Sequence, residues 1–251
     1  MHSRLSAPIV LVHGLLGFDR VTAGPLTLNR YFPGIEETLR GAGYRVAVPS
    51  LSKTRGVAQR ARELRDYLLE NFPNEPVHLI GHSMGGLDAR YMVSRLEMHE
   101  KVLSITSVGT PHLGSTLADW GVRRLARIAG PMFRFWGIST DAFCDLTTDR
   151  CARFNEIVRD VPEVRYFSVA GRCDPRQLSP LLRPASEFVA RAEGDNDGVV
   201  SVRSATHGES IDVWETDHMG LVNRRNPRVP GWRDRPADYL RLVNRLSAVE
   251  F

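Results

Sequence analysis

Residues 77–86 read VHLIGHSMGG, a short apolar run that ends in a serine flanked by glycines. The first four residues predict a strand, and a helix is predicted to begin near Met84. Gly81 and Gly85 allow neighbouring backbones to pass closely, so a sharp, strained turn can present the Ser83 hydroxyl. At the start of a helix this hydroxyl also faces free N–H groups, which favour negative charge. The stretch therefore predicts a nucleophilic serine, with an ordinary structural turn as the alternative.

Elsewhere in the chain, short β-branched runs alternate with segments of helical period. We predict strands at residues 8–12, 44–48, 77–80, 102–108, 164–170 and 210–214. We predict helices at residues 33–41, 57–72, 84–98 and 236–248. In the second of these helices Val57, Ala61 and Leu64 share an apolar face, and Arg60 falls outside that face. The pattern predicts an α/β fold, a mostly parallel sheet with helices on both faces, in one domain over residues 1–251.

Residues 115–150 interrupt this alternation, because they carry no strand signal. A span of this length between two strands is usually an inserted segment with its own structure. Apolar residues are spread through it, including Trp120, Phe133, Phe135 and Trp136. We therefore expect residues 115–150 to form a lid or cap.

Length, composition and charge exclude several classes of protein. The chain has 251 residues, of which 42% are hydrophobic, enough for one substantial core. Its apolar runs are far shorter than the roughly 20 residues that span a bilayer, so no transmembrane segment is expected. The 33 basic and 29 acidic residues are interspersed and leave a net charge of +4. This favours a solvated basic surface over a nucleic-acid interface, which needs clustered charge.

Three cysteines make an odd count: Cys144, Cys151 and Cys173. A disulfide between the first two is possible, but the odd number and loose spacing favour reduced thiols. The first seven residues lack the apolar segment of a secretion signal. We therefore expect a cytoplasmic protein, with secretion as the alternative if the chain has been trimmed.

A serine nucleophile needs a general base, and the base needs an orienting acid. Among eight histidines, His218 follows the last predicted strand and precedes the last helix, where the base is expected if the chain order is serine, acid, histidine. The acid should lie on an earlier loop. Asp174, Asp195 and Asp197 all qualify by position, and spacing does not choose between them.

The oxygen of an attacked carbonyl needs hydrogen-bond donors. The N–H of Met84, directly after the serine, is the first candidate. The second should lie in the glycine-lined loop after the first strand, VHGLLGF at residues 12–18, where we select the N–H of Leu15.

Five stretches occur in the order VHGLLGFD (12–19), GHSMGGLDARY (81–91), TSVGTPHLGS (106–115), NDGVVS (196–201) and DHMGLVN (217–223). Together they resemble the bacterial lipases of the α/β-hydrolase superfamily, in the branch of the Pseudomonas and Burkholderia enzymes. The resemblance spans nearly the whole chain and implies the α/β-hydrolase fold. It implies that Ser83 is the nucleophile and His218 the base, and it favours Asp197 as the acid. It also implies that Leu15 and Met84 are the oxyanion donors and that residues 115–150 form the lid.

The chain departs from these relatives at a calcium site that steadies the histidine loop. One calcium carboxylate lies two residues after the catalytic histidine, and here that position is Gly220, although Asp174 stands near the place of another ligand. A hard cation needs several oxygen ligands. We therefore predict no metal and no cofactor.

These residues predict a carboxylic-ester hydrolase, a lipase or esterase that cleaves acylglycerols or other acyl esters through an acyl-enzyme. The expected partner is a small-molecule or lipid ester substrate, which the enzyme could also meet at a lipid–water interface. The apolar surface offered to its acyl chain would come from four aromatic residues: Trp120, Phe133, Phe135 and Trp136. Core packing explains half or more of these aromatic residues equally well. The alternatives are a thioesterase, polyester hydrolase or amidase with the same triad, or a non-catalytic binding protein.

Overall fold

The computed structural model describes residues 5–15, 20–23, 26–128, 141–178, 180, 183–225 and 234–248. Its centre is a six-stranded parallel sheet with strand order β4-β1-β5-β6-β7-β8. The strands are β1 (Ile9–Val12), β4 (Val46–Ala47), β5 (Val77–His82), β6 (Val102–Val108), β7 (Arg165–Arg172) and β8 (Glu209–Glu215). All six predicted strands are therefore present, and the predicted α/β class is confirmed.

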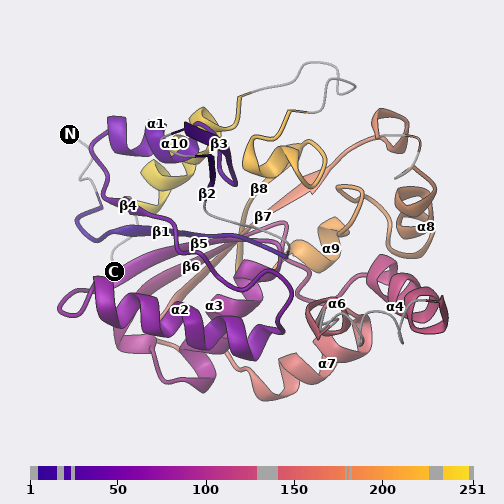
Figure 1. The fold of residues 1–251 in the computed structure, drawn as a ribbon, viewed down its shortest axis with the longest axis horizontal. Helices are drawn as coiled ribbons and strands as arrows, with labels where there is room; N and C mark the ends of the chain where they lie inside the picture. The colour runs from indigo at the N-terminus through magenta and orange to yellow at the C-terminus, as the bar shows by residue number, and fades with distance from the viewer. Residues whose placement is uncertain are drawn as a thin grey trace.

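Helices cover both faces of this sheet (Figure 1). One face carries α1 (Ile35–Gly41) and α10 (Pro236–Leu246), and the other carries α2 (Val57–Asn71) and α3 (Met84–Arg95). Strand β1 shows why, because Ile9 and Leu11 pack in the cluster with α1 and α10 while Val10 and Val12 pack in the cluster with α2 and α3. A strand buried on both faces has this continuous apolar sequence.

The ends of the predicted helices differ by a few residues from those observed. Helix α3 stops at Arg95 rather than residue 98, because Glu97 takes the left-handed conformation, with φ of 56°. Helix α1 begins two residues later than predicted, after Gly34, whose φ of 77° cannot belong to a right-handed helix. Each boundary is set by one residue with positive φ.

Several elements have no counterpart in the prediction. They are the antiparallel hairpin of β2 (Arg20–Ala23) and β3 (Leu26–Arg30), and the helices α7 (Thr148–Ile157), α8 (Arg183–Glu193) and α9 (Val202–Ala205). Helix α9 has only four residues and the hairpin strands only four and five, which is too short for a clear period. Of these elements, α7 overlaps the end of the expected cap region.

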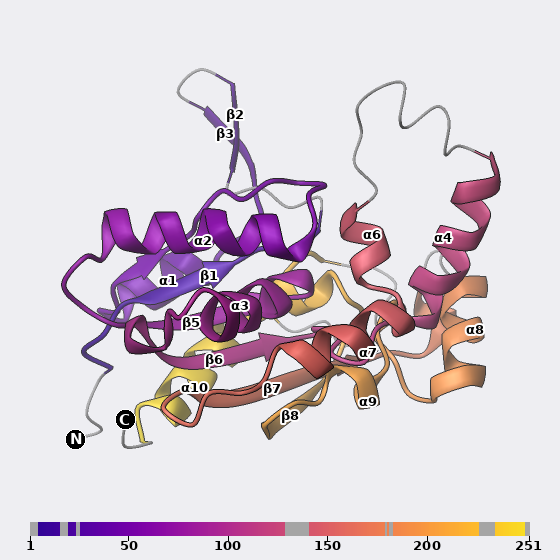
Figure 2. The same cartoon turned by 90° about the horizontal axis from the view of Figure 1, so that it is seen from below.

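The described part of residues 115–150, where a cap was expected, also contains α4 (Thr116–Ile128) and α6 (Asp141–Asp145). Both helices lie at the end of the molecule opposite the two termini (Figure 2). Trp120 is on α4 and is 46% exposed, whereas Phe133, Phe135 and Trp136 lie outside the described residues. Within the described ranges, no helix is both long enough and apolar enough to cross a membrane.

Candidate active site

Ser83 stands between β5 and α3 in a strained backbone conformation, with φ of 53° and ψ of −127°. Residues other than glycine avoid this region, and holding one there costs about 1–3 kcal/mol. The surrounding packing enforces it: a Cβ at position 81 would lie 2.6 Å from the backbone of Gly85, and one at position 85 would lie 2.5 Å from the carbonyl oxygen of Val12. The two flanking glycines are therefore required by the close approach of three backbones.

His218 and Asp197 meet on the loops that follow β8 and β7. His218 Nδ1 donates to Asp197 Oδ2 across 2.7 Å, and the backbone N–H of His218 donates to the Asp197 carbonyl across 2.8 Å. The other carboxylate oxygen, Oδ1, accepts from the N–H groups of Val199 and Val200. Asp197 is buried, and its bonds to the His218 ring and to the N–H of Val200 are buried with it. The carboxylate therefore has a fixed position and the His218 ring a fixed orientation.

The pKa of His218 is raised above the ordinary histidine value. Burial alone would lower this pKa, but the charge of Asp197, its hydrogen bond to the ring and the charge of Asp217 together raise it. These groups stabilise the imidazolium, the form that a general base acquires when it takes a proton.

His82, the residue before Ser83 in the chain, lies against His218. The ring centroids of His82 and His218 are 4.6 Å apart. The two remaining acid candidates have other partners: the Asp174 side chain accepts from the N–H of Arg176, and Asp195, with its side chain 71% exposed, pairs with Arg172. Of the three aspartates, Asp197 is the one that the structure brings to His218.

The two expected oxyanion donors lie on either side of the serine. Met84 is buried in the first turn of α3, and Leu15 is partly buried after β1. The Leu15 loop is adjacent to the nucleophile, because a Cβ on Gly14 would lie 2.8 Å from Ser83 Cβ. The N–H groups of Leu15 and Met84 remain predictions as donors.

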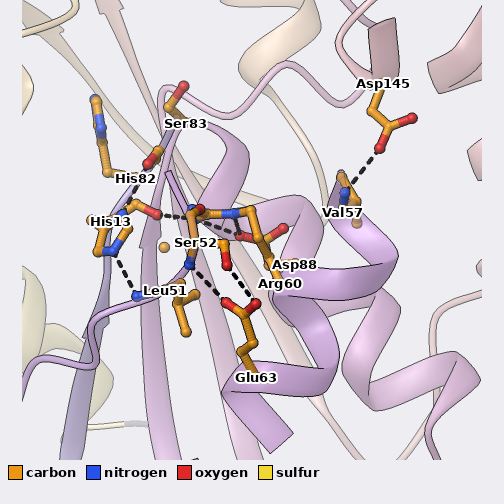
Figure 3. A network of polar contacts seen from close by, with 12 residues as sticks. His13, Leu51, Ser52, Val57, Arg60, Glu63, His82, Ser83, Asp88 and Asp145 are labelled. Carbon is orange, nitrogen blue, oxygen red and sulfur yellow. Dashed lines mark hydrogen bonds and ion pairs between the residues drawn. The ribbon is translucent and has the colours of Figure 1, made fainter. Parts of the chain in front are cut away.

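A buried polar network supports this loop, and the sequence did not indicate it (Figure 3). Arg60 and Asp88 form an ion pair with both side chains 0% exposed. Arg60 was expected outside the apolar face of its helix, and this was wrong: its guanidinium is satisfied by the Asp88 carboxylate and by the carbonyl oxygens of His13 and Ser52. Burial raises the pKa of Asp88 to about 7 even beside this cation. Only tertiary structure supplies these partners, so helical periodicity alone could not find them.

The residues near the expected calcium position do not fit a calcium site. The N–H of Gly220 donates to Asp217 Oδ1 across 2.7 Å, and Asp174 caps the short 3₁₀ helix Pro175–Gln177. No cluster of three or more metal-binding side chains occurs within the part of the chain that is described. Cys144, Cys151 and Cys173 are free thiols.

Comparison with known proteins gives consistent results. Residues 7–130 match the family described as alpha/beta hydrolase fold. A triacylglycerol lipase of Vibrio cholerae is 40% identical, over 86% of this chain and 79% of the relative, and one of Pseudomonas fragi is 31% identical, over 86% and 87%. The crystal structure of the mature lipase BlEst2 of Bacillus licheniformis, 24% identical, superposes with a TM-score of 0.71 over 94% of this chain and 91% of that one.

Proposed function

The chain belongs to the bacterial lipases of the α/β-hydrolase superfamily and is a serine carboxylic-ester hydrolase, and on this basis we propose that Ser83, His218 and Asp197 form its catalytic triad. Ser83 is the nucleophile, His218 the general base, and Asp197 the acid that orients His218. The observation that carries the proposal is the 2.7 Å bond from His218 Nδ1 to Asp197 Oδ2 beside a strained serine.

In the acylation step, Ser83 Oγ attacks the ester carbonyl carbon while His218 Nε2 takes the hydroxyl proton. The carbonyl oxygen becomes an oxyanion, which the N–H groups of Leu15 and Met84 hold. When the tetrahedral intermediate collapses, His218 gives its proton to the leaving alcohol. Ser83 is then esterified by the acyl group.

Deacylation repeats the same chemistry with water as the nucleophile. His218 takes a proton from water as the water oxygen attacks the acyl-enzyme carbonyl, and the same two N–H groups hold the second oxyanion. The proton then passes to Ser83 Oγ, and the carboxylic acid leaves. Asp197 remains ionised throughout and stabilises the imidazolium in both steps.

For the substrate we propose acylglycerols, with residues 115–150 as a cap over the acyl chain. Two observations support this: the curated relatives at 31% and 40% identity are named triacylglycerol lipases, and Trp120 exposes 46% of its surface on α4. An exposed indole on a helix of this region offers apolar contact area to a hydrocarbon chain.

The proposal is tested with Ser83→Ala and a matched buried serine, Ser104→Ala, whose side chain contacts His78 instead. Ser83→Ala is expected to lower kcat on short p-nitrophenyl esters by about 10⁴-fold or more, with an unchanged circular dichroism spectrum. Ser104→Ala should retain activity. Near-native hydrolysis by folded Ser83→Ala would overturn the triad. Rates on triacylglycerols of increasing chain length, compared with matched thioesters and amides, test the substrate class.

A further inference from the structure

The peptide unit between His13 and Gly14 is held at both of its ends. Its carbonyl oxygen accepts from Arg60 Nη2 across 2.5 Å, and its N–H donates to the Tyr31 hydroxyl across 3.1 Å. Arg60 is itself fixed by the buried Asp88 carboxylate, and Tyr31 is buried between β3 and α1 (Figure 3 shows Arg60 and Asp88). Because a peptide unit is planar, two opposed anchors leave it no freedom to rotate.

The next peptide unit, between Gly14 and Leu15, is held through its carbonyl oxygen. His13 Nδ1 donates to Gly14 O across 2.9 Å. The tautomer is settled by the other ring nitrogen, since Nε2 accepts from the backbone N–H of Leu51 across 3.0 Å, and a neutral imidazole then carries its proton on Nδ1. In a trans peptide the N–H points away from the carbonyl oxygen. Fixing Gly14 O therefore fixes the direction of the Leu15 N–H.

We infer that His13, Tyr31 and Arg60 are positioning residues that preset the Leu15 N–H as an oxyanion donor before substrate arrives. This inference rests on the proposed function, in which that N–H binds the oxyanion. Donors that are already oriented need no reorganisation during reaction, and this is the source of their catalytic effect. None of the three side chains touches the reacting atoms in this scheme, so their effect passes through the backbone of the loop.

Tyr31 also connects this loop to the general base. Its hydroxyl donates to His82 Nδ1 across 2.8 Å, and His82 Nε2 donates to the backbone carbonyl of His218 across 3.0 Å. Burial holds the pKa of His82 well below the ordinary value, and the charge of Arg224 lowers it further, so the ring stays neutral and can donate and accept at once. One chain of hydrogen bonds thus runs from the N–H of Gly14 to the residue proposed as base.

The test uses Tyr31→Phe, which removes a single oxygen atom, and Tyr239→Phe as the matched control. Tyr239 is also fully buried, but its hydroxyl has no hydrogen-bond partner among the residues that the structure describes, so its loss should leave activity unchanged. Each variant is assayed on an oxygen ester and on the matching thionoester, whose carbonyl sulfur is a poor acceptor for the two N–H donors. A displaced oxyanion donor slows the oxygen ester alone, whereas a displaced base slows both substrates equally.

For Tyr31→Phe we expect kcat on the oxygen ester to fall about tenfold with KM unchanged, and the oxygen-ester to thionoester rate ratio to fall by a similar factor. Arg60→Lys keeps the charge beside Asp88 but loses the forked geometry, and it should shift the ratio in the same direction. It also serves as the test if Tyr31→Phe does not fold.

Wild-type rate ratios in folded Tyr31→Phe and Arg60→Lys would overturn the inference. The Ser83→Ala variant separates this outcome from failure of the triad. If Ser83→Ala is inactive but Tyr31→Phe and Arg60→Lys keep the wild-type rate ratio, only the positioning role is rejected. If folded Ser83→Ala stays active, the triad itself is rejected.

Discussion

Both oxygens of the Asp197 carboxylate accept hydrogen bonds. One oxygen accepts from the His218 ring, and the other accepts from two backbone N–H groups. An asparagine amide has one oxygen and one NH2 group, so it cannot accept both from the ring N–H and from the backbone N–H groups, and its NH2 group favours the wrong histidine tautomer. We expect Asp197→Asn to lower kcat by about 10³–10⁴-fold. Steady-state kinetics measure this. Asp195→Asn, on the same loop but exposed, is the control and should remain near wild type.

The pH dependence follows from the same pair. A general base must be neutral, so kcat/KM should rise as pH increases through the pKa of His218, which lies above the ordinary histidine value. Removing the Asp197 charge removes a group that raises this pKa, so the acid limb of the residual activity of Asp197→Asn should move to lower pH. A limb that stays in place or moves to higher pH would contradict the assignment.

The strain at Ser83 predicts a trade between activity and stability. Ser83→Gly relieves a conformation with φ of 53° and ψ of −127°, which glycine adopts freely. Because glycine also loses more entropy on folding, we expect a net gain of about 1 kcal/mol in the free energy of unfolding, with activity abolished. Urea denaturation measures this gain. Ser83→Ala keeps the strain, and equal stability of the two variants would show that the strain is not stored there.

At the scale of elements, α2 begins without a side-chain cap of its own. Gly56 stands at the N-cap position, and the N–H of Val57 donates instead to Asp145 Oδ2 on α6, across 2.8 Å. We expect Asp145→Ala to lower the free energy of unfolding by about 1 kcal/mol, the usual effect of losing a cap. Chemical denaturation tests this against Asp66→Ala, an exposed aspartate on α2 that should change stability little.

The elements differ in how far the sequence could predict them. The six strands were predicted because β5 and its neighbours are apolar on both faces, and α2 because its inner face repeats every three to four residues. Helix α9 is only four residues long, too short for a period. The role of Arg60 could not be predicted, because a buried arginine is marked by its partners, and Asp88 and the carbonyl of His13 are distant in sequence. Spacing alone could not choose among the three aspartates; the family resemblance favoured Asp197, and the structure places Asp197 against His218.

At the scale of the whole molecule, the candidate site spans the ends of five adjacent strands, β1, β5, β6, β7 and β8, and Gly109 follows the middle one, β6. The backbone of Gly109 has a φ of 59°, which residues other than glycine rarely adopt. A Cβ at this position would lie 2.5 Å from Leu221 Cδ1 and 3.3 Å from Asp197 Oδ2. We expect Gly109→Ala to destabilise the fold by about 1–3 kcal/mol and to reduce kcat, because it pushes the Asp197 and His218 loops apart. Thermal melts and kinetics measure both. Gly121→Ala is the control: among the described residues a Cβ there meets nothing within 4 Å, so this change within α4 should leave kcat unchanged and raise stability by about 0.5–1 kcal/mol.

The order of the strands also governs when the protein can become active during its synthesis. Ser83 and both proposed oxyanion donors precede β6, whereas Asp197 and His218 arrive only with the loops after β7 and β8, at the edge of the sheet. A ribosome therefore releases the proposed nucleophile well before the proposed base. We expect the nascent chain to carry an inert serine until the last edge strand, β8, has paired.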